Sequence, residues 1–230
     1  MTYVIPIWIP PALPVAGSSD SFPVRRIFCV GANYAEHQRE MGADGRATPF
    51  FFSKSAHALV PGDGPVEYPL ETADCHFEPE MVVAIGRRGR QIPLARAHAH
   101  VFGYGVGFDV TRRDLQRLAK QHGRPWLFAK DFEGAAPCSE LHRASTIGHP
   151  VSGTIRLEIN GEERQRADLS DMIWSVSEQI VHLSRYYTLE AGDLIYTGTP
   201  AGVCPVRPGD DLRATVEGVA RLCVTVVAST

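Results

Sequence analysis

Three carboxylates in two apolar stretches have a spacing that suits divalent-metal chemistry. Glu78 and Glu80 stand two residues apart at the start of an apolar run, and Asp109 closes a second apolar run, residues 101–108. Side chains alternate along a strand, so both glutamates would share one face. The other face would carry the apolar side chains Phe77, Met81, Val83 and Ile85.

Two carboxylates that share a buried strand face repel each other unless they are protonated, paired with a cation or bound to a metal. If the strand of Asp109 lies beside that of Glu78 and Glu80, three oxygen ligands converge. Such a set suits Mg²⁺ or Mn²⁺ and leaves positions for substrate and water. Without that convergence, the two glutamates would form a solvated strand end.

A histidine and a glutamate three residues apart form a second candidate pair. His37 and Glu40 would lie on the same face of a helix. With an unperturbed pKa of about 6.5, a histidine can be neutral at working pH and act as a general base. Glu40 could accept its N–H and orient the ring, as a triad acid does. Alternatively, His37 is an ordinary solvated histidine on a polar helix.

The elements that would position these residues are mostly short strands. Helices are predicted over residues 33–41, with Asn33 as N-cap, over 111–122, and over 170–187, with Ser170 or Asp171 as N-cap. Asn160-Gly161 is a strong hairpin signal. Because strands and helices do not alternate regularly, an α+β, mainly β domain is expected rather than a doubly wound sheet. Strands are predicted over residues 26–31, 50–53, 76–86, 101–108, 153–160 and 194–197, with two more in 212–227.

Length and composition favour one globular domain. The chain has 230 residues, a formal net charge of −3 and 44% hydrophobic residues, which argues against disorder and nucleic-acid binding. Residues 1–24 are predicted to form an extended N-terminal arm, and residues 25–230 a single catalytic domain. No run suggests a membrane span or a signal peptide. Five scattered cysteines suggest free thiols in the cytoplasm: Cys29, Cys75, Cys138, Cys204 and Cys223.

Six segments, taken in order, resemble the fumarylacetoacetate hydrolase family, and in particular its small acylpyruvate hydrolases. A single Glu-x-Glu would be weak evidence, whereas six segments in the family's order are specific. They are residues 27–40 (IFCVGANYAEHQRE), 50–54 (FFFSK), 76–86 (HFEPEMVVAIG), 104–116 (YGVGFDVTRRDLQ), 123–130 (GRPWLFAK) and 192–203 (GDLIYTGTPAGV).

The resemblance implies a β-roll or sandwich with a few peripheral helices, a homodimer, and a role for each matching residue. Glu78, Glu80 and Asp109 would bind Mg²⁺ or Mn²⁺, with the catalytic Lys130 beside them. His37 and Glu40 would be catalytic residues on a lid helix. Substrate would be held by Arg113 and Gln116 at its oxo-acid end, by Thr199 at its carboxylate, and by Lys54 in the pocket wall.

This chain departs from the family pattern at three places. Ala32 stands where the family usually has an arginine, which removes a cation near the entrance. Pro79, between the metal glutamates, lacks an N–H and must lie at a strand end, an edge or a bulge. Ser55-Ala56 replaces a turn that often contains proline. Trp126 and Trp174 are expected in the core.

The implied activity is hydrolysis of a carbon–carbon bond in a 2,4-dioxo acid, with fumarylpyruvate giving fumarate and pyruvate in the breakdown of aromatic compounds. His37 and Glu40 would activate water, and the metal would stabilise the pyruvate enolate. Two alternatives stay open within the family: an oxaloacetate decarboxylase, or a 2-hydroxy-diene-dioate isomerase or decarboxylase. A third, of another class, is a catalytically silent oxo-acid-binding protein. The expected partner is a small oxo acid, with no nucleic acid and no membrane.

Overall fold

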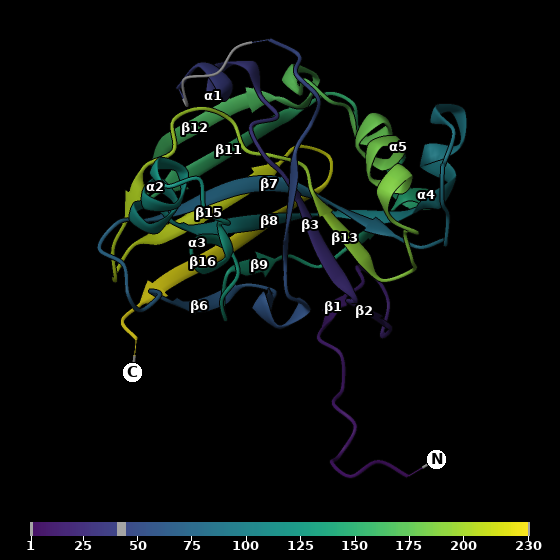
Figure 1. Cartoon of the computed structure of the whole chain (residues 1–230), viewed down its shortest axis with the longest axis horizontal. Helices are drawn as coiled ribbons and strands as arrows, with labels where there is room; N and C mark the ends of the chain where they lie inside the picture. Colours follow the sequence, from purple (N-terminus) through teal and green to yellow (C-terminus); the bar gives the residue numbers. More distant parts are fainter. Residues whose placement is uncertain (1, 41–44, 230) are drawn as a thin grey trace.

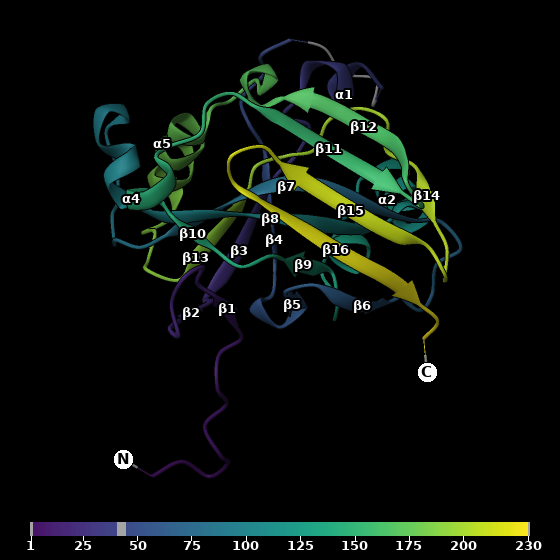
Figure 2. The same ribbon diagram turned by 180° about the vertical axis from the view of Figure 1, so that it is seen from behind.

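Two curled β-sheets packed face to face form the body of the protein, with short helices around them (Figure 1, and Figure 2 from behind). The computed structural model describes residues 2–40 and 45–229. The expected α+β, mainly β sandwich with peripheral helices is confirmed. The helices are α1 (Ala35–Glu40), η1 (Ala56–Ala58), η2 (Leu94–His100), α2 (Arg113–Gln121), α3 (Leu127–Lys130), α4 (Ala144–Ile147), η3 (Leu169–Asp171) and α5 (Val176–Tyr186).

The larger sheet contains both strands of the predicted metal site. Within the described residues its main path runs β4-β3-β13-β7-β8-β9-β5, with β10 paired to β8 and β14 paired to β7. Its strands are β3 (Arg26–Val30), β4 (Phe51–Lys54), β5 (Leu59–Pro61), β7 (Cys75–Ile85), β8 (Val101–Arg112), β9 (Ala136–Cys138), β10 (His142–Arg143), β13 (Asp193–Tyr196) and β14 (Pro205–Val206).

The smaller sheet covers one face of β7 and β8. Its order is β12-β11-β15-β16-β6, and the predicted Asn160-Gly161 hairpin joins β11 to β12. Both turn residues have positive φ, 54° and 82°, as a type I′ turn requires. Its strands are β6 (Gly64–Glu67), β11 (Thr154–Ile159), β12 (Glu162–Asp168), β15 (Asp211–Val216) and β16 (Ala220–Val227).

The odd-numbered side chains of β7 face the smaller sheet, as the predicted alternation requires. Phe77, Met81 and Val83 pack in one apolar core with Leu157 of β11 and Val224 of β16. The even-numbered side chains of β7 therefore face away from the smaller sheet. Burial of this apolar face fixes the register of β7, since a shift of one residue would turn the glutamates into the core.

Pro79 lies inside β7, opposite Phe108 of β8, without a bulge at that point. The backbone of Met81 points away from β8, because its carbonyl accepts a hydrogen bond from Thr197 N at 3.1 Å. By alternation the nitrogen of Pro79 also points away from β8. On that side β7 pairs with β13 only at residues 82–84 and with β14 only at residues 75–76. Pro79 thus occupies a local edge, one of the three settings predicted for it.

The predicted N-caps of two helices differ from the structure. The long helix α5 begins at Val176 with Ser175 as N-cap, so the expected caps Ser170 and Asp171 are wrong. The reason is a capping box, in which the Glu178 carboxylate accepts a hydrogen bond from Ser175 N at 3.0 Å. Asn33 is not an N-cap either, because its buried amide spans two other segments. The last residue of that predicted helix, Met41, lies outside the described residues.

The N-terminal segment is only partly an extended arm. Residues 2–11 run away from the body (Figure 1), whereas β1 (Ala12–Pro14) and β2 (Ser21–Pro23) pair with each other. Leu13 is fully buried, which ties this hairpin to the body. The five cysteines are free, as predicted. Among the described helices none combines the length and apolarity needed to span a membrane.

Gly107 of β8 is required by close packing. It lies opposite Glu80 in the ladder, and a Cβ there would lie 2.7 Å from Cε1 of Tyr196 and 2.9 Å from the Pro137 carbonyl oxygen. We predict that Gly107→Ala lowers the free energy of unfolding by about 1–3 kcal/mol through overpacking. Gly105→Ala is the matched control, because its closest contact would be 3.1 Å. Thermal denaturation of both variants measures the difference, and equal stabilities would contradict this prediction.

Candidate metal centre

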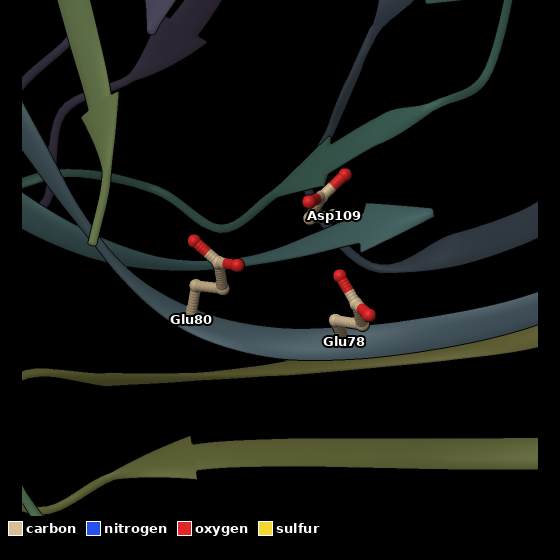
Figure 3. A group of neighbouring side chains, drawn as sticks. All are labelled: Glu78, Glu80 and Asp109. Atoms are coloured by element: carbon tan, nitrogen blue, oxygen red, sulfur yellow. The ribbon is translucent and has the colours of Figure 1, made fainter. Parts of the chain in front are cut away.

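The three predicted carboxylates converge on one face of the larger sheet. Glu78 lies directly opposite Asp109 in the antiparallel ladder of β7 and β8, and Glu80 is two residues further along β7. Figure 3 shows the three side chains pointing toward one another. One oxygen from each lies within 4.8 Å of the others. Their residues are 4%, 2% and 1% exposed, respectively, so water screens their repulsion poorly.

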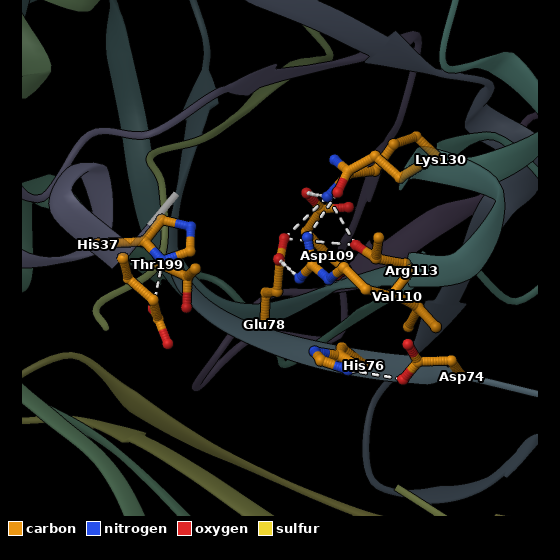
Figure 4. Close-up of polar contacts among 12 residues, drawn as sticks. His37, Asp74, His76, Glu78, Asp109, Val110, Arg113, Lys130 and Thr199 are labelled. Carbon is orange, nitrogen blue, oxygen red and sulfur yellow. Dashed lines mark hydrogen bonds and ion pairs between the residues drawn. The ribbon is translucent and has the colours of Figure 1, made fainter. Parts of the chain in front are cut away.

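Two of the three carboxylates are paired with cations. Lys130 Nζ lies 2.8 Å from Glu78 Oε2 and 2.5 Å from Asp109 Oδ2, and the Arg113 guanidinium donates to Glu78 Oε1 (Figure 4). Although burial alone would raise it, the positive charges of Lys130 and Arg113 hold the pKa of Glu78 well below its usual range. Lys54 Nζ lies 2.8 Å from Asp109 Oδ1. Glu78 and Asp109 therefore each have cationic partners.

Glu80 has a different environment. Its carboxylate accepts one hydrogen bond, from Gly198 N at 2.8 Å, and no ion pair to it is found within the described residues. Burial, and then the neighbouring charges of Asp109 and Glu78, raise the pKa of Glu80 well above its usual range. Asp109 Oδ1 also lacks a hydrogen bond despite its nearness to Lys54. One buried oxygen of Asp109 thus lacks a hydrogen bond, and Glu80 lacks the cationic partner that a buried anion needs.

These residues fit a hard divalent cation. They supply three carboxylate oxygens within reach of one ion, and Glu80 would gain the positive charge that it lacks. Carboxylate oxygens are the ligands that Mg²⁺ and Mn²⁺ prefer. Three ligands from the chain leave the remaining positions of an octahedral shell for substrate and water. The cluster can therefore hold a metal with open coordination positions.

A cavity of about 230 Å³ opens onto this cluster. Of the predicted site residues, Lys54 and Glu40 are not in its wall, whereas the others are. The Lys54 side chain is fully buried and donates to the carbonyls of Val110 and Lys130. It thus holds Asp109 from behind instead of lining the cavity as expected. The predicted residues in the wall are His37, Glu78, Glu80, Asp109, Arg113, Gln116, Lys130 and Thr199.

His37 of α1 faces this cavity and is backed by Glu40. Its Nδ1 lies 3.0 Å from Glu40 Oε2, and the same oxygen accepts a hydrogen bond from Gly202 N at 3.3 Å. In Figure 4, His37 and Thr199 lie on one side of Glu78, with Lys130 and Arg113 on the other. If Nδ1–H is donated to Glu40, the lone pair of Nε2 is left free to accept a proton.

Two buried amides hold the surrounding loops. Asn33, just before α1, donates to the carbonyls of Trp174 (3.0 Å) and Thr197 (2.8 Å) and accepts from Trp174 N. Gln165 of β12 donates to Thr199 Oγ1 at 3.1 Å and to the Pro200 carbonyl at 2.8 Å. The role of Gln165 could not be predicted from the sequence, since nothing in the pattern of β12 distinguishes it from a solvated strand residue.

The cavity wall also contains aromatic residues and a lysine that were not predicted from the sequence to belong to the site. Trp126 is not a core residue as expected: it is half-buried and lines the cavity with Phe50 and Phe52. The rings of Phe50 and Phe52 lie 5.6 and 5.8 Å from that of Trp126. Lys120, on α2 one turn after Gln116, completes the wall. Its helical spacing from Arg113 and Gln116 was the signal that could have found it.

Comparison with known proteins agrees with this geometry. The family described as fumarylacetoacetate (FAA) hydrolase C-terminal matches residues 26–227. A fumarylpyruvate hydrolase from a Ralstonia species is 44% identical over 77% of this chain and 92% of its own. The oxaloacetate tautomerase YcgM of Escherichia coli K12 is 38% identical over 88% of this chain and 93% of its own.

A solved structure resembles almost the whole chain. The crystal structure of fumarylpyruvate hydrolase from Pseudomonas aeruginosa, in complex with Mn²⁺ and pyruvate, has a TM-score of 0.97. It is 45% identical and covers 99% of this chain and 100% of that one. Because the family match spans residues 26–227, this chain belongs to the fumarylacetoacetate hydrolase family.

Proposed function

We propose that this protein is a divalent-metal-dependent hydrolase that cleaves the C3–C4 bond of an acylpyruvate, with fumarylpyruvate as its substrate. The observation that carries the proposal is that His37, backed by Glu40, faces the cavity onto which the three-carboxylate cluster opens. The fumarylpyruvate hydrolases of Ralstonia and P. aeruginosa support this substrate. We further propose Mg²⁺ or Mn²⁺ as the ion, and a cytoplasmic homodimer that acts in the breakdown of aromatic compounds.

The residues divide the reaction between two sides of the cavity. On one side, His37 takes a proton from water while the water oxygen bonds to the distal carbonyl carbon, C4. Glu40 stabilises the imidazolium that forms. On the other side, Lys130 and Arg113 place positive charge near the oxo group of the pyruvate half. Thr199, which lies on the His37 side of Glu78, would bind the carboxylate of that half together with backbone N–H groups. A bound divalent ion supplies Lewis-acid stabilisation of the enolate charge.

The bond changes balance without a further reactant. As the C3–C4 bond breaks, its electron pair stays with C3 as the enolate of pyruvate. His37 then returns its proton to C3, which yields pyruvate, and C4 leaves as the carboxylate of fumarate. The carboxylic-acid proton of the second product goes to solvent. Each turnover therefore consumes one water.

A second candidate is the tautomerisation or decarboxylation of oxaloacetate, which the E. coli relative favours. These reactions share the need to stabilise an enolate but have no attacking water. Ala32 and Pro79, as departures from the family pattern, are the residues that would favour the alternative of a catalytically silent binding protein. Pro79 leaves Glu78 and Glu80 on a common face, so its presence does not count against catalysis. An ultraviolet assay of fumarylpyruvate, acetylpyruvate and oxaloacetate with Mg²⁺ or Mn²⁺ tests all three possibilities.

We predict that Glu80→Gln removes both metal binding and turnover. The amide keeps the side-chain shape but not the negative charge, so Mn²⁺ affinity should fall at least about 100-fold, more than typical outer-shell changes cause. Calorimetric titration with Mn²⁺ and the ultraviolet assay measure the two effects. Glu162→Gln, at a side chain that is 70% exposed, is the matched control. Full activity of Glu80→Gln would refute the metal assignment.

We predict that His37→Ala separates the two candidate reactions. Loss of the general base should lower kcat for fumarylpyruvate hydrolysis by about 10²–10⁴-fold. Turnover of oxaloacetate, which needs no activated water, should fall much less. Mn²⁺ affinity measured by calorimetry should stay unchanged, which shows that the metal cluster is intact. Undiminished fumarylpyruvate hydrolysis by this variant would rule out His37 as the base.

A further inference from the structure

Lys120 is the cavity cation without a carboxylate partner in the part of the chain that the structure describes. The chain contains three lysines, and the other two, Lys54 and Lys130, both contact Asp109. Arg113 is bound to Glu78. Lys120 makes neither an ion pair nor a hydrogen bond within the described residues. Its ammonium lies over the Trp126 ring, whose centroid is 5.2 Å from Nζ.

The surroundings of Lys120 disfavour its charge. Partial burial of the ammonium, and then the positive charge of Arg113, lower the pKa of Lys120. An anion bound in the cavity beside this ammonium would stabilise its charged form and so raise its pKa again. The neighbouring Arg112 is not available for that role, because its guanidinium stacks on Phe132 at 4.1 Å and donates to the Phe128 carbonyl. Arg112 is also absent from the cavity wall.

The position of Lys120 suits the far end of a substrate. It follows Gln116 by four residues and Arg113 by seven on one face of α2, a spread of about 10 Å along the helix axis. The two carboxylate carbons of a seven-carbon 2,4-dioxo dicarboxylic acid are about 7 Å apart when extended, at about 1.2 Å per bond. Arg113 and Gln116 would meet the oxo-acid end. Between the two ends, Phe50, Phe52 and Trp126 provide a flat apolar wall.

Ala32 strengthens the case for Lys120. This residue lines the cavity with a positive φ of 50° and supplies no cation there. The cation that would meet a second substrate carboxylate must therefore come from another element. Among the described cavity residues, Lys120 is the cation still free to do so.

We propose that Lys120 binds the distal carboxylate of the acyl chain and so selects dicarboxylic acylpyruvates over those with an uncharged end. This inference rests on the proposed function, which it deepens. The Trp126 ring contacts the Lys120 ammonium in the cavity wall through a cation–π interaction. The charged acyl end then lies at the mouth of the cavity and the reacting carbons lie beside the carboxylate cluster.

The test compares two substrates that share a dioxo-acid head. For Lys120→Met, kcat/KM for fumarylpyruvate relative to acetylpyruvate should fall about 10–100-fold, the value of one charge-assisted hydrogen bond. The loss should appear mainly in KM, because the distal carboxylate does not react. Lys120→Arg should restore most of the preference. Arg117→Met is the matched control, since Arg117 is on the same helix, ion-paired to Asp74 and outside the cavity wall.

A binding measurement separates this inference from the proposed reaction. Calorimetry on the Mn²⁺-loaded protein compares fumarate with crotonate, which lacks the second carboxylate. Wild type should prefer fumarate, and Lys120→Met should lose that preference even if no acylpyruvate is turned over. Two results would overturn the inference: a ratio of kcat/KM values that stays unchanged, whether or not both values fall, or a fumarate preference that does not depend on Lys120.

Discussion

Everything in this structure depends on holding three carboxylates together inside a sheet. At about 4.8 Å, two unit charges in an effective dielectric of about 20 repel by roughly 3 kcal/mol. The fold sustains this because β7 and β8 are anchored elsewhere. Their opposite face is packed against the smaller sheet, so the backbone cannot shift to relieve the repulsion without losing that core. The apolar face thus supports the charged one.

The cations around the cluster affect which ligands the cavity can bind. Three cations, Lys54, Lys130 and Arg113, already contact two of the three carboxylates. A divalent ion would therefore bring positive charge in excess of the protein's own anions. In a buried cavity that excess favours an anionic ligand, and an acylpyruvate bound as its enolate and carboxylate carries two negative charges. By the same argument, a cavity that holds a divalent ion would favour an oxo acid over a neutral carbonyl compound.

The helices carry several of the charged and polar residues of the site. Lys130 and Arg113 come from short helices that pack against β8, whereas His37 comes from α1, which Asn33 ties to two loops. The base and the carboxylates therefore belong to different elements. This separation fits a reaction in which water is activated on one side and the enolate is stabilised on the other.

The sequence by itself determined the face relationships within each strand. Alternation along the strand placed Glu78 and Glu80 on one face. The Asn160-Gly161 turn could be predicted from its two residues alone. The family segments indicated Asp109, Lys130 and His37. These depend on short-range backbone geometry or on an ordered set of motifs. The start of α5 was predicted wrongly because Ser170, Asp171 and Ser175 are all capable N-caps, and only the Glu178 contact selects Ser175.

Tertiary structure alone decided which long side chains reach the cavity. Lys54 and Lys120 look alike in sequence, yet Lys54 is buried behind Asp109 while Lys120 stands at the cavity wall. Trp126 is a large apolar residue of the kind expected in a core, but it lines the cavity. Gln165, from the smaller sheet, donates a hydrogen bond to Thr199. These contacts join residues far apart in the chain. Their distances depend on how sheets and helices pack, which no local pattern specifies.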